Sequence, residues 1–404
     1  MKPKPSPSDR SRAKAAANAI PLLVGAKLWR ARQAELCACA SGRTGRATQQ
    51  THAIELCIER LRQRPAASEA ELRIAHLLQD LAELAASLPP CGQERLVARL
   101  RQGLSGSGTL IPLFHLLRTA ALHRERGYAV SHDGLQDGTP FDLLIHRDTM
   151  EAEIVCDVIS AEEGRLVHRG AWFNLVDRVD PELQTWLAAH PGRYLLKLTL
   201  PHGLKGTPAP DDGTSALASL HQRITAMLND RRRADHDEAA VLRLDPLLLA
   251  GAQADELGLA SRLRQEFGPE AQLSVTAAGN GVFVMAARSG KENDIAAAIR
   301  RRMAALAPTR LSGTRPGILA MFIEDTDRAE WRGLRDRLEL EGEARQFMTH
   351  VEARPVVAIT CASRMEMFGI GGPDAAPTGE VRFRNPAHPA AKAPALAQAI
   401  LSSL

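Results

Sequence analysis

Three carboxylates interrupt the most apolar part of this sequence. Asp142, Glu153 and Asp157 lie inside two short runs of strand-forming residues, at 141–147 and 152–160. An acidic side chain is seldom buried in a strand unless it is paired with a cation or binds a metal ion. Two carboxylates on adjacent strands can hold a divalent cation that polarises a phosphate and activates a water molecule. The acids therefore indicate either a metal-dependent hydrolytic site or buried ion pairs.

Alternation along the second run places Glu153 and Asp157 on one face of its strand. Both can then point toward the strand that begins at Asp142. The alternative for each acid is structural. Asp142 would then cap or pair with a nearby arginine, and Glu153 would lie at the solvent-facing start of its strand. Asp157 would bond to His168 or Arg169.

The elements that carry these acids follow the order helix, strand, strand, strand, helix, strand. The first helix has Pro112 in its first turn and Gly127 at its end, the usual residues at a helix start and stop. Apolar runs bounded by turn residues predict the strands. The expected elements are a helix at 112–126, strands at 128–132, 141–147 and 152–160, helices at 164–179 and 181–190, and a strand at 193–200.

This order resembles the core of the PD-(D/E)XK nuclease superfamily, the restriction-endonuclease-like fold. Its members place an Asp at the start of the second core strand and a Glu-x-Lys or Asp-x-Lys motif on the third. The sequence PFD at 140–142 matches the first motif, and EIVCDVI at 153–159 supplies the third strand. Neither acid of that strand has a lysine two residues later, so the motif is degenerate.

The resemblance implies metal-dependent phosphodiester hydrolysis, with Asp142, Glu153 and Asp157 as the catalytic acids. It also implies that Asp142 and Asp157 are the ligands of Mg²⁺ or Mn²⁺. In the family, a lysine on the third strand positions or activates the attacking water. Lys197, on the following predicted strand, is the candidate replacement for the missing lysine.

The resemblance also implies DNA or RNA as the partner. Arg165, His168 and Arg169, near the start of the helix after the third strand, are the candidate nucleic-acid contacts. The missing lysine favours an alternative, a non-catalytic scaffold or regulatory protein that uses the core for protein interaction. A third possibility is an unrelated α/β protein that binds a partner protein and no nucleic acid.

Composition and charge set the class of protein. The chain has 404 residues with 45% hydrophobic and 24% charged residues, as expected of a globular protein with more than one core. Residues 1–64 hold 13 Lys and Arg against 4 Asp and Glu, a net charge of +9 within a total of +4. Such an arm binds nucleic acid or an acidic surface, or is a solvated tail.

We expect an α/β fold, a mixed sheet with flanking helices, together with a helical N-terminal region and a C-terminal α/β domain. In the C-terminal half, AGNG at 278–281 between two apolar runs predicts a β-hairpin. Helices are expected at 256–265 and 292–306, and strands at 317–323 and 355–361. The three arginines at 300–302 on the second helix could contact phosphate, but a solvated basic face is the commoner case. The expected regions are a disordered basic tail at 1–15, helices at 16–108, the restriction-endonuclease-like domain at 109–250, the C-terminal domain at 251–368 and a loop-rich tail at 369–404.

Cysteine usage and hydropathy bear on the compartment. Of the six cysteines only Cys37 and Cys39 are close together, and no second pair completes a four-ligand zinc site. Free thiols in a reducing cytoplasm are expected. No stretch approaches ~18 uninterrupted apolar residues, so no membrane span is expected. Two glycine-rich runs, at 103–108 and 369–372, are predicted as a linker and a flexible loop, since neither has the setting of a phosphate-binding loop.

Overall fold

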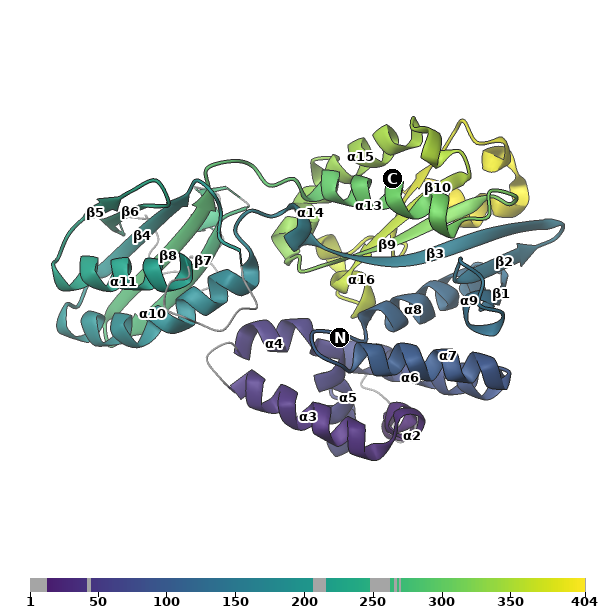
Figure 1. The fold of residues 1–404 in the computed structure, drawn as a ribbon, viewed down its shortest axis with the longest axis horizontal. Coiled ribbons are helices and arrows are strands. Elements are labelled where there is room, and N and C mark those ends of the chain that lie inside the picture. The colour runs from purple at the N-terminus through teal and green to yellow at the C-terminus, as the bar shows by residue number, and fades with distance from the viewer. Residues whose placement is uncertain are drawn as a thin grey trace. The chain divides into compact units, whose positions relative to one another are not determined.

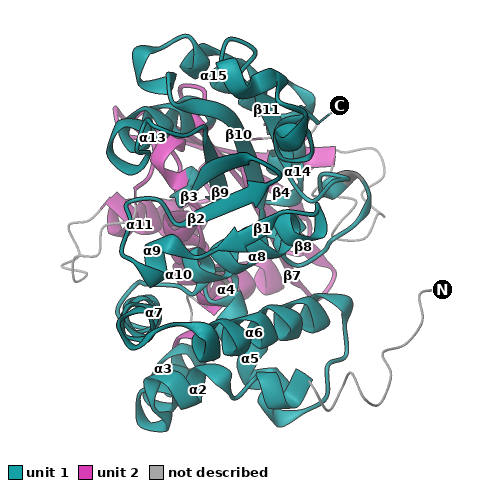
Figure 2. Ribbon diagram, turned by 90° about the vertical axis from the view of Figure 1, so that its right-hand side faces the viewer, with its two compact units in different colours: residues 1–38, 49–161, 296–404 teal, residues 39–48, 162–295 magenta. Residues whose placement is uncertain are grey.

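A computed structural model describes residues 13–41, 45–205, 216–247, 262–264, 267–268 and 270–403, and it confirms the α/β class. The chain divides into two compact units (Figure 2). Unit 1 comprises residues 1–38, 49–161 and 296–404, and unit 2 comprises residues 39–48 and 162–295. The contiguous boundaries expected from the sequence, 109–250 and 251–368, do not coincide with this division. The chain leaves unit 1 after its third strand and returns to add three more.

Helices form the first part of the chain. Helix α6 shows why: Ser68 accepts a hydrogen bond from the N–H of Glu71 at its start, Ile74 and Leu78 are buried one turn apart, and Pro89 follows its end. The helices are α2 (Ala19–Val24), α3 (Ala26–Ser41), α4 (Gly45–Thr51), α5 (Ala53–Gln63), α6 (Glu69–Ser87), α7 (Pro90–Gly103) and α8 (Ile111–Glu125). The tail at 1–12 lies outside the described residues.

The sheet of unit 1 has six strands in the order β1-β2-β3-β9-β10-β11. Strands β3, β9 and β10 are parallel, while β1, β2 and β11 run antiparallel to their neighbours. All eight residues of β10 are buried, as expected of a strand covered on both faces. The strands are β1 (Ala129–Ser131), β2 (Leu143–Arg147), β3 (Met150–Ser160), β9 (Gly317–Glu324), β10 (Val356–Ser363) and β11 (Val381–Arg384).

Helices cover both faces of this sheet. Helix α8 and the helices before it lie on one face, and α13 to α15 lie on the other (Figures 1 and 2). The remaining helices of unit 1 are α9 (Asp133–Gln136), α13 (Ile295–Arg310), α14 (Arg328–Asp336), α15 (Glu339–Met348), α16 (Arg364–Met367) and α17 (Ala397–Ile400). The tail after residue 369, expected to be loop-rich, also contributes β11, which pairs with β10.

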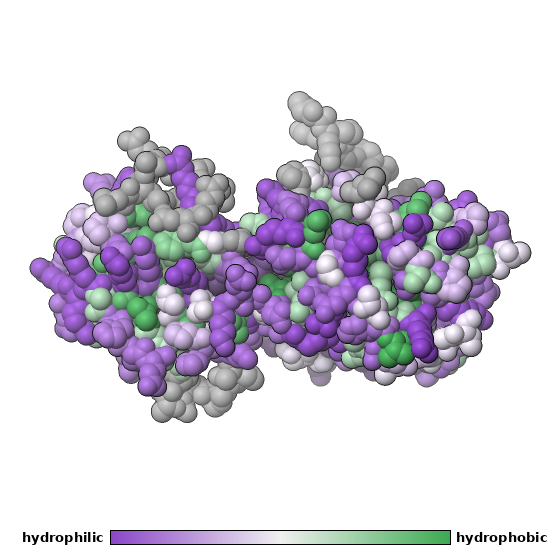
Figure 3. Space-filling model, turned by 90° about the horizontal axis from the view of Figure 1, so that it is seen from above, coloured by the Kyte–Doolittle hydropathy of each residue, from purple (hydrophilic) through white to green (hydrophobic). Residues whose placement is uncertain are grey.

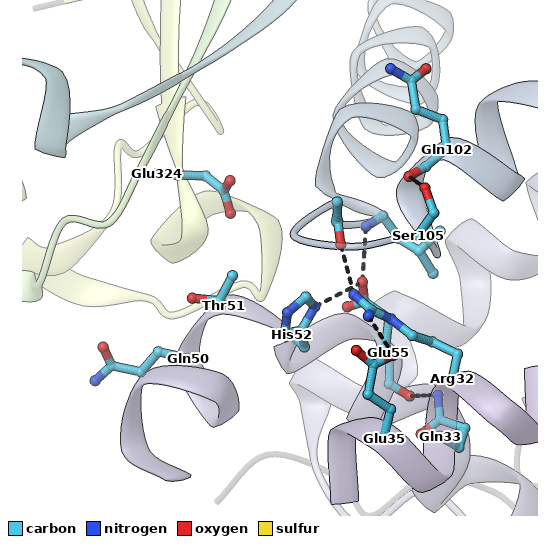
Figure 4. A network of polar contacts seen from close by, with 12 residues as sticks. Arg32, Gln33, Glu35, Gln50, Thr51, His52, Glu55, Gln102, Ser105 and Glu324 are labelled. Carbon is cyan, nitrogen blue, oxygen red and sulfur yellow. Dashed lines mark hydrogen bonds and ion pairs between the residues drawn. The ribbon is translucent and has the colours of Figure 1, made fainter. Parts of the chain in front are cut away.

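The predicted linker at 103–108 is held by specific contacts. Arg32 Nη2 donates to the carbonyl of Gly108 at 3.0 Å, and the N–H of Leu110 donates to the buried carboxylate of Glu55 at 3.1 Å. Figure 4 shows Arg32 and Glu55 converging on this turn. The segment is therefore a fixed turn inside unit 1 and not a spacer between domains.

Unit 2 has its own sheet, in the order β5-β6-β4-β8-β7. The hairpin predicted around 278–281 is confirmed: Ala278 pairs with Gly281, and Gly279 takes a positive φ of 55°. Helices α10 and α11 pack on one face. The elements are α10 (Arg169–Ala189), β4 (Arg193–Leu200), α11 (Ala216–Asn229), β5 (Ala234–His236), β6 (Val241–Pro246), β7 (Gln272–Ala278) and β8 (Gly281–Ser289). The helix expected near 256–265 lies largely outside the described residues.

The surface shows few large apolar side chains. Among the described residues the exposed ones are Leu22, Val241, Leu338, Val351 and Leu401. On the face drawn in Figure 3, apolar side chains are scattered among hydrophilic ones. No helix in the described ranges is long and apolar enough to cross a membrane.

Candidate functional site

Asp142 bridges helices from both faces of the sheet in unit 1. It lies just before β2 and is buried. Its Oδ1 accepts from Arg99 Nη2 of α7 at 3.1 Å, and its Oδ2 accepts from Arg310 Nη2 of α13 at 2.9 Å. Oδ2 also accepts from the N–H of Cys156 on β3, at 2.9 Å. The structural alternative, pairing with arginine, is what the structure shows for this acid.

Glu153 is fully buried in β3, so it does not lie at a solvent-facing strand start. Its carboxylate accepts from the N–H and the hydroxyl of Ser312, at 2.9 and 2.6 Å. Arg315 Nη1 is 3.6 Å from the same carboxylate, and Arg315 Nε is 2.8 Å from Glu151. Glu153 therefore fixes the turn between α13 and β9.

Asp157 forms a bidentate pair with Arg302 of α13, with Nε–Oδ2 and Nη2–Oδ1 distances of 2.6 and 2.9 Å. This fork geometry is the strongest form of carboxylate–guanidinium contact. The partners weighed from the sequence were His168 and Arg169. Arg302 is the partner instead because α13 crosses the face of β3 to which Asp157 points.

Four arginines thus surround the predicted acids, and we call Arg99, Arg302, Arg310 and Arg315 the arginine rim. Their side chains remain between 30% and 43% exposed. Both oxygens of each predicted metal ligand accept hydrogen bonds from guanidinium groups. In this arrangement a divalent cation does not fit between Asp142 and Asp157, since it would lie beside those fixed positive charges.

Within the described ranges, no cluster of three or more His, Cys, Asp or Glu side chains is positioned to hold a metal ion. The arrangement of acids and arginines supports anion binding by the arginines more directly than cation binding by the acids.

Lys197 lies on β4, in the sheet of unit 2. The expectation that its strand lies beside the third strand is not met, because β3 pairs with β2 and β9. Lys197 Nζ is 3.1 Å from Asp245 of β6 and lies 5.3 Å from the ring centroid of Phe267. Its charge is engaged within unit 2.

The three candidate nucleic-acid residues of the sequence gather around one carboxylate in unit 2. Arg165 forms an ion pair with Glu162, His168 Nδ1 is 3.7 Å from it, and the N–H of Arg169 donates to it at 2.8 Å. Arg165 is 2% exposed and Arg169 is 8% exposed. These two arginines present little surface to a phosphate backbone.

Sequence analysis missed the arginine rim. Its members are 43 to 168 residues from the acids that they bind. The one available signal was the number of arginines on the predicted helix at 292–306, which was interpreted as a solvated basic face. No local spacing links such a helix to an acid on a strand.

A second polar group lies at the carboxyl ends of the parallel strands. Arg364 Nη2 is 3.0 Å from Glu324 at the end of β9, and Arg364 also donates to the carbonyls of Gln50 and Thr51. Figure 4 shows Glu324 facing the helical turn of Thr51 and His52. Burial raises the pKa of Glu324 to about 6 from its usual 4.5.

This raised pKa makes a testable statement about stability. Above pH 6 the carboxylate of Glu324 is ionised in both states, and the charge is less well solvated in the folded chain. The contribution of Glu324 to the stability of unit 1 therefore rises as the pH falls from 6 to 4.5. The Glu324→Gln variant keeps the acceptor for Arg364 without the charge. We expect it to raise the free energy of unfolding at pH 8 by up to about 2 kcal/mol and to leave it unchanged near pH 4.5. Urea titrations at both pH values measure this, and a destabilised variant at pH 8 would show that the ion pair outweighs burial.

The fold is that of a mixed α/β protein. The sheet of unit 1, whose strands β3 and β9 are separated in sequence by residues 162–295, carries a cluster of acids and arginines. Comparison with known proteins finds no matching family model, no similar curated protein and no similar solved structure.

Proposed function

We propose that this chain binds nucleic acid through the arginine rim of unit 1 and does not hydrolyse it. One observation carries the proposal: an arginine that remains partly exposed lies against each predicted catalytic acid. A guanidinium has five N–H donors in a planar fork, and the acids engage only some of them. The remaining donors of Arg99, Arg310 and Arg315 can bind phosphate oxygens while the acids hold the fork in place.

Two further features support this proposal. Helix α8, strands β1 to β3, helix α13 and strand β9 follow the element order of the restriction-endonuclease-like core, with residues 162–295 inserted after β3. The net charge of +9 in residues 1–64 adds attraction for a polyanion. The six cysteines, all within the described residues, form no disulfide, which supports a cytoplasmic protein.

Gel-shift titrations at several salt concentrations test the binding. We expect binding to DNA or RNA that weakens steeply with salt, and Arg310→Ala or Arg315→Ala should each reduce the slope of log K against log salt by about one. Each variant leaves its acid other donors, from Arg99 and Cys156 for Asp142 and from Ser312 for Glu153. Arg345→Ala, which removes an exposed arginine paired with Glu341 on α15, is the matched control.

The same protein is then incubated with plasmid and single-stranded substrates in Mg²⁺ or Mn²⁺. We expect no cleavage. Cleavage that Asp142→Ala abolishes would instead assign a metal-dependent nuclease and overturn the non-hydrolytic proposal. Absence of salt-dependent binding to both DNA and RNA would favour the alternative, a scaffold or regulatory protein that binds another protein.

A further inference from the structure

A cavity of about 930 Å³ lies in unit 1, separate from the acids and the arginine rim. Helices α6 and α8 form two walls, and the chain from Met365 to Gly379, after β10, forms the third. This volume is in the range of small-molecule pockets. The position also fits, because ligands of open α/β sheets bind beyond the carboxyl ends of parallel strands.

One end of the cavity carries a partly buried cation. Arg118 Nη2 donates to the carbonyl of Gly379, while Nη1 is buried and has no hydrogen-bond partner. In the described part of the chain no carboxylate lies within ion-pair distance of Arg118. Burial is the main cause that lowers the pKa of Arg118, and the nearby charge of Arg73 acts in the same direction. An anion at this end would supply the missing partner.

A glycine-rich segment lies against the second arginine of this end. Gly369 has a φ of +68°, a conformation that favours glycine, and the Arg73 side chain occupies the space that a Cβ there would need. The N–H groups of Gly371 and Gly372 that follow donate to no acceptor in the described residues. Arg73, Arg118 and these N–H groups together form a set of anion-binding donors.

Nearby acids do not neutralise Arg118 because they are already satisfied, whereas Arg73 Nη2 lies 3.5 Å from the partly exposed Glu69. Glu366 accepts from Trp331 Nε1, from the N–H and the hydroxyl of Ser363, and from the N–H of Ala376, at 2.7 to 3.0 Å. Glu380, the strongest acidic neighbour of Arg118, is paired with Arg126 at 2.6 Å.

The other end of the cavity carries acceptors. Asp80 of α6 is half-buried, and burial raises its pKa despite the nearby charge of Arg124. No hydrogen bond or ion pair of the Asp80 carboxylate occurs within the described ranges, and Glu125 of α8 lines the same end. A ligand group that donates hydrogen bonds, such as an amine, suits this end.

Because one end of the cavity carries cationic donors and the other carries acceptors, we infer that the cavity binds a phosphorylated small molecule of nucleotide size. Its phosphate lies at Arg73, Arg118 and the glycine N–H groups, and its donor groups face Asp80. The inference is independent of the proposed nucleic-acid binding, since the arginine rim contributes no residue to the cavity.

Isothermal titration of the full chain tests this inference. The probes are the four common nucleoside monophosphates, their nucleosides, ribose 5-phosphate and inorganic phosphate. We expect at least one nucleotide to bind about tenfold or more tightly than its nucleoside and than inorganic phosphate. Arg73→Ala should weaken that nucleotide about tenfold and leave the nucleoside unchanged. Asp80→Asn should weaken the nucleotide and leave ribose 5-phosphate unchanged.

Control variants separate this site from the rest of the surface. Arg345→Ala removes an exposed i,i+4 ion pair like that of Arg73 with Glu69, and Arg315→Ala removes a rim arginine. Neither should change nucleotide affinity. Because Arg118 is partly buried, Arg118→Met is used only if it has the same unfolding temperature as the parent protein, and it should then act like Arg73→Ala. Failure of every nucleotide to bind, equal binding of nucleotide and nucleoside, or full affinity in Arg73→Ala would each overturn the inference.

Discussion

Acidification from pH 7 to pH 4 is expected to unfold unit 1. Three histidines of this unit are almost fully buried, and burial lowers the pKa of each to about 4 from the usual 6.5. They are His115 and His123 on α8 and His132 before α9. Neutral imidazole fits these positions, while a protonated ring would be a poorly solvated charge.

The surroundings of each ring oppose protonation. His115 Nε2 contacts the carbonyl of Ala320 at 2.9 Å, and its Nδ1 has no partner. Neither ring nitrogen of His123 has a partner, and Nε2 of His132 has none. The charged neighbours are Arg118, Glu380 and Asp157 for His115, Glu380, Arg126 and Arg382 for His123, and Arg124 for His132. Glu380 and Asp157 favour protonation of these rings, but desolvation is the largest cause of the lowered pKa of each histidine.

The direction of the pH dependence follows from the linkage between proton binding and folding. Because the folded-state pKa is depressed, the unfolded chain takes up protons first, and stability present above pH 6.5 is lost as the pH falls toward 4. A difference of about 2.5 units corresponds to about 3 kcal/mol for each histidine. Three such losses approach the roughly 5–15 kcal/mol that holds a typical domain folded.

Tryptophan fluorescence can follow unit 1 alone. In a Trp172→Phe and Trp186→Phe background the remaining reporters, Trp29 and Trp331, are both fully buried in unit 1. We expect their signal to change between pH 6.5 and pH 4. His123→Phe, which breaks no hydrogen bond and keeps a ring beside Tyr128, should move this transition to lower pH. An unchanged transition would refute the role of His123. His115→Phe, by contrast, should lower the free energy of unfolding at pH 7 by about 1 kcal/mol, because it removes the hydrogen bond to the carbonyl of Ala320.

Asp142→Ala is expected to lower the free energy of unfolding by about 3–5 kcal/mol at pH 7. The substitution leaves two guanidinium groups facing each other and removes the acceptor of the Cys156 N–H. Removing one partner of a buried pair is costly because the other charge stays behind. Arg99→Ala or Arg310→Ala should cost only about 1 kcal/mol, since each arginine is partly exposed and Asp142 keeps its other donors.

Denaturant titrations of the single and double variants measure this difference. The loss in Asp142→Ala should shrink when Arg310→Ala is added, because one of the two unpaired cations is then gone. Asp230→Ala, at an exposed aspartate paired with Arg232, serves as the control and should change stability by less than about 0.5 kcal/mol. A small loss in Asp142→Ala would mean that the bridge between α7 and α13 contributes little.

Local patterns in the sequence predicted the elements well. The strand expected at 193–200 is β4 with the same bounds, and those near 317–323 and 355–361 are β9 and β10. The helix break expected at Pro181 is wrong, because α10 continues through it to Ala189. Val179, Leu183 and Leu187 are buried along one face of α10. This packing stabilises the helix even though Pro181 has no backbone N–H to donate.

The pairing of those elements could not be predicted in the same way. Nothing near β3 indicates that its parallel neighbour is β9 and not β4, since both are short apolar runs. The partner of Asp157 lies 145 residues away on α13, and the partner of Glu153 lies 159 residues away at Ser312. Periodicity reports which side of a strand is buried, but it does not identify the distant side chain that meets it.

The insertion of residues 162–295 has a consequence for synthesis. During translation at roughly 5–20 residues per second, β3 leaves the ribosome many seconds before β9. During that time the edge of β3 that pairs with β9 has no partner strand. The inserted segment can close on itself in the interval, because the N–H of Asp294 donates to the carbonyl of Gly164 at 2.7 Å and joins its two ends. The inserted segment can therefore fold before unit 1 is complete, although unit 1 begins earlier in the chain.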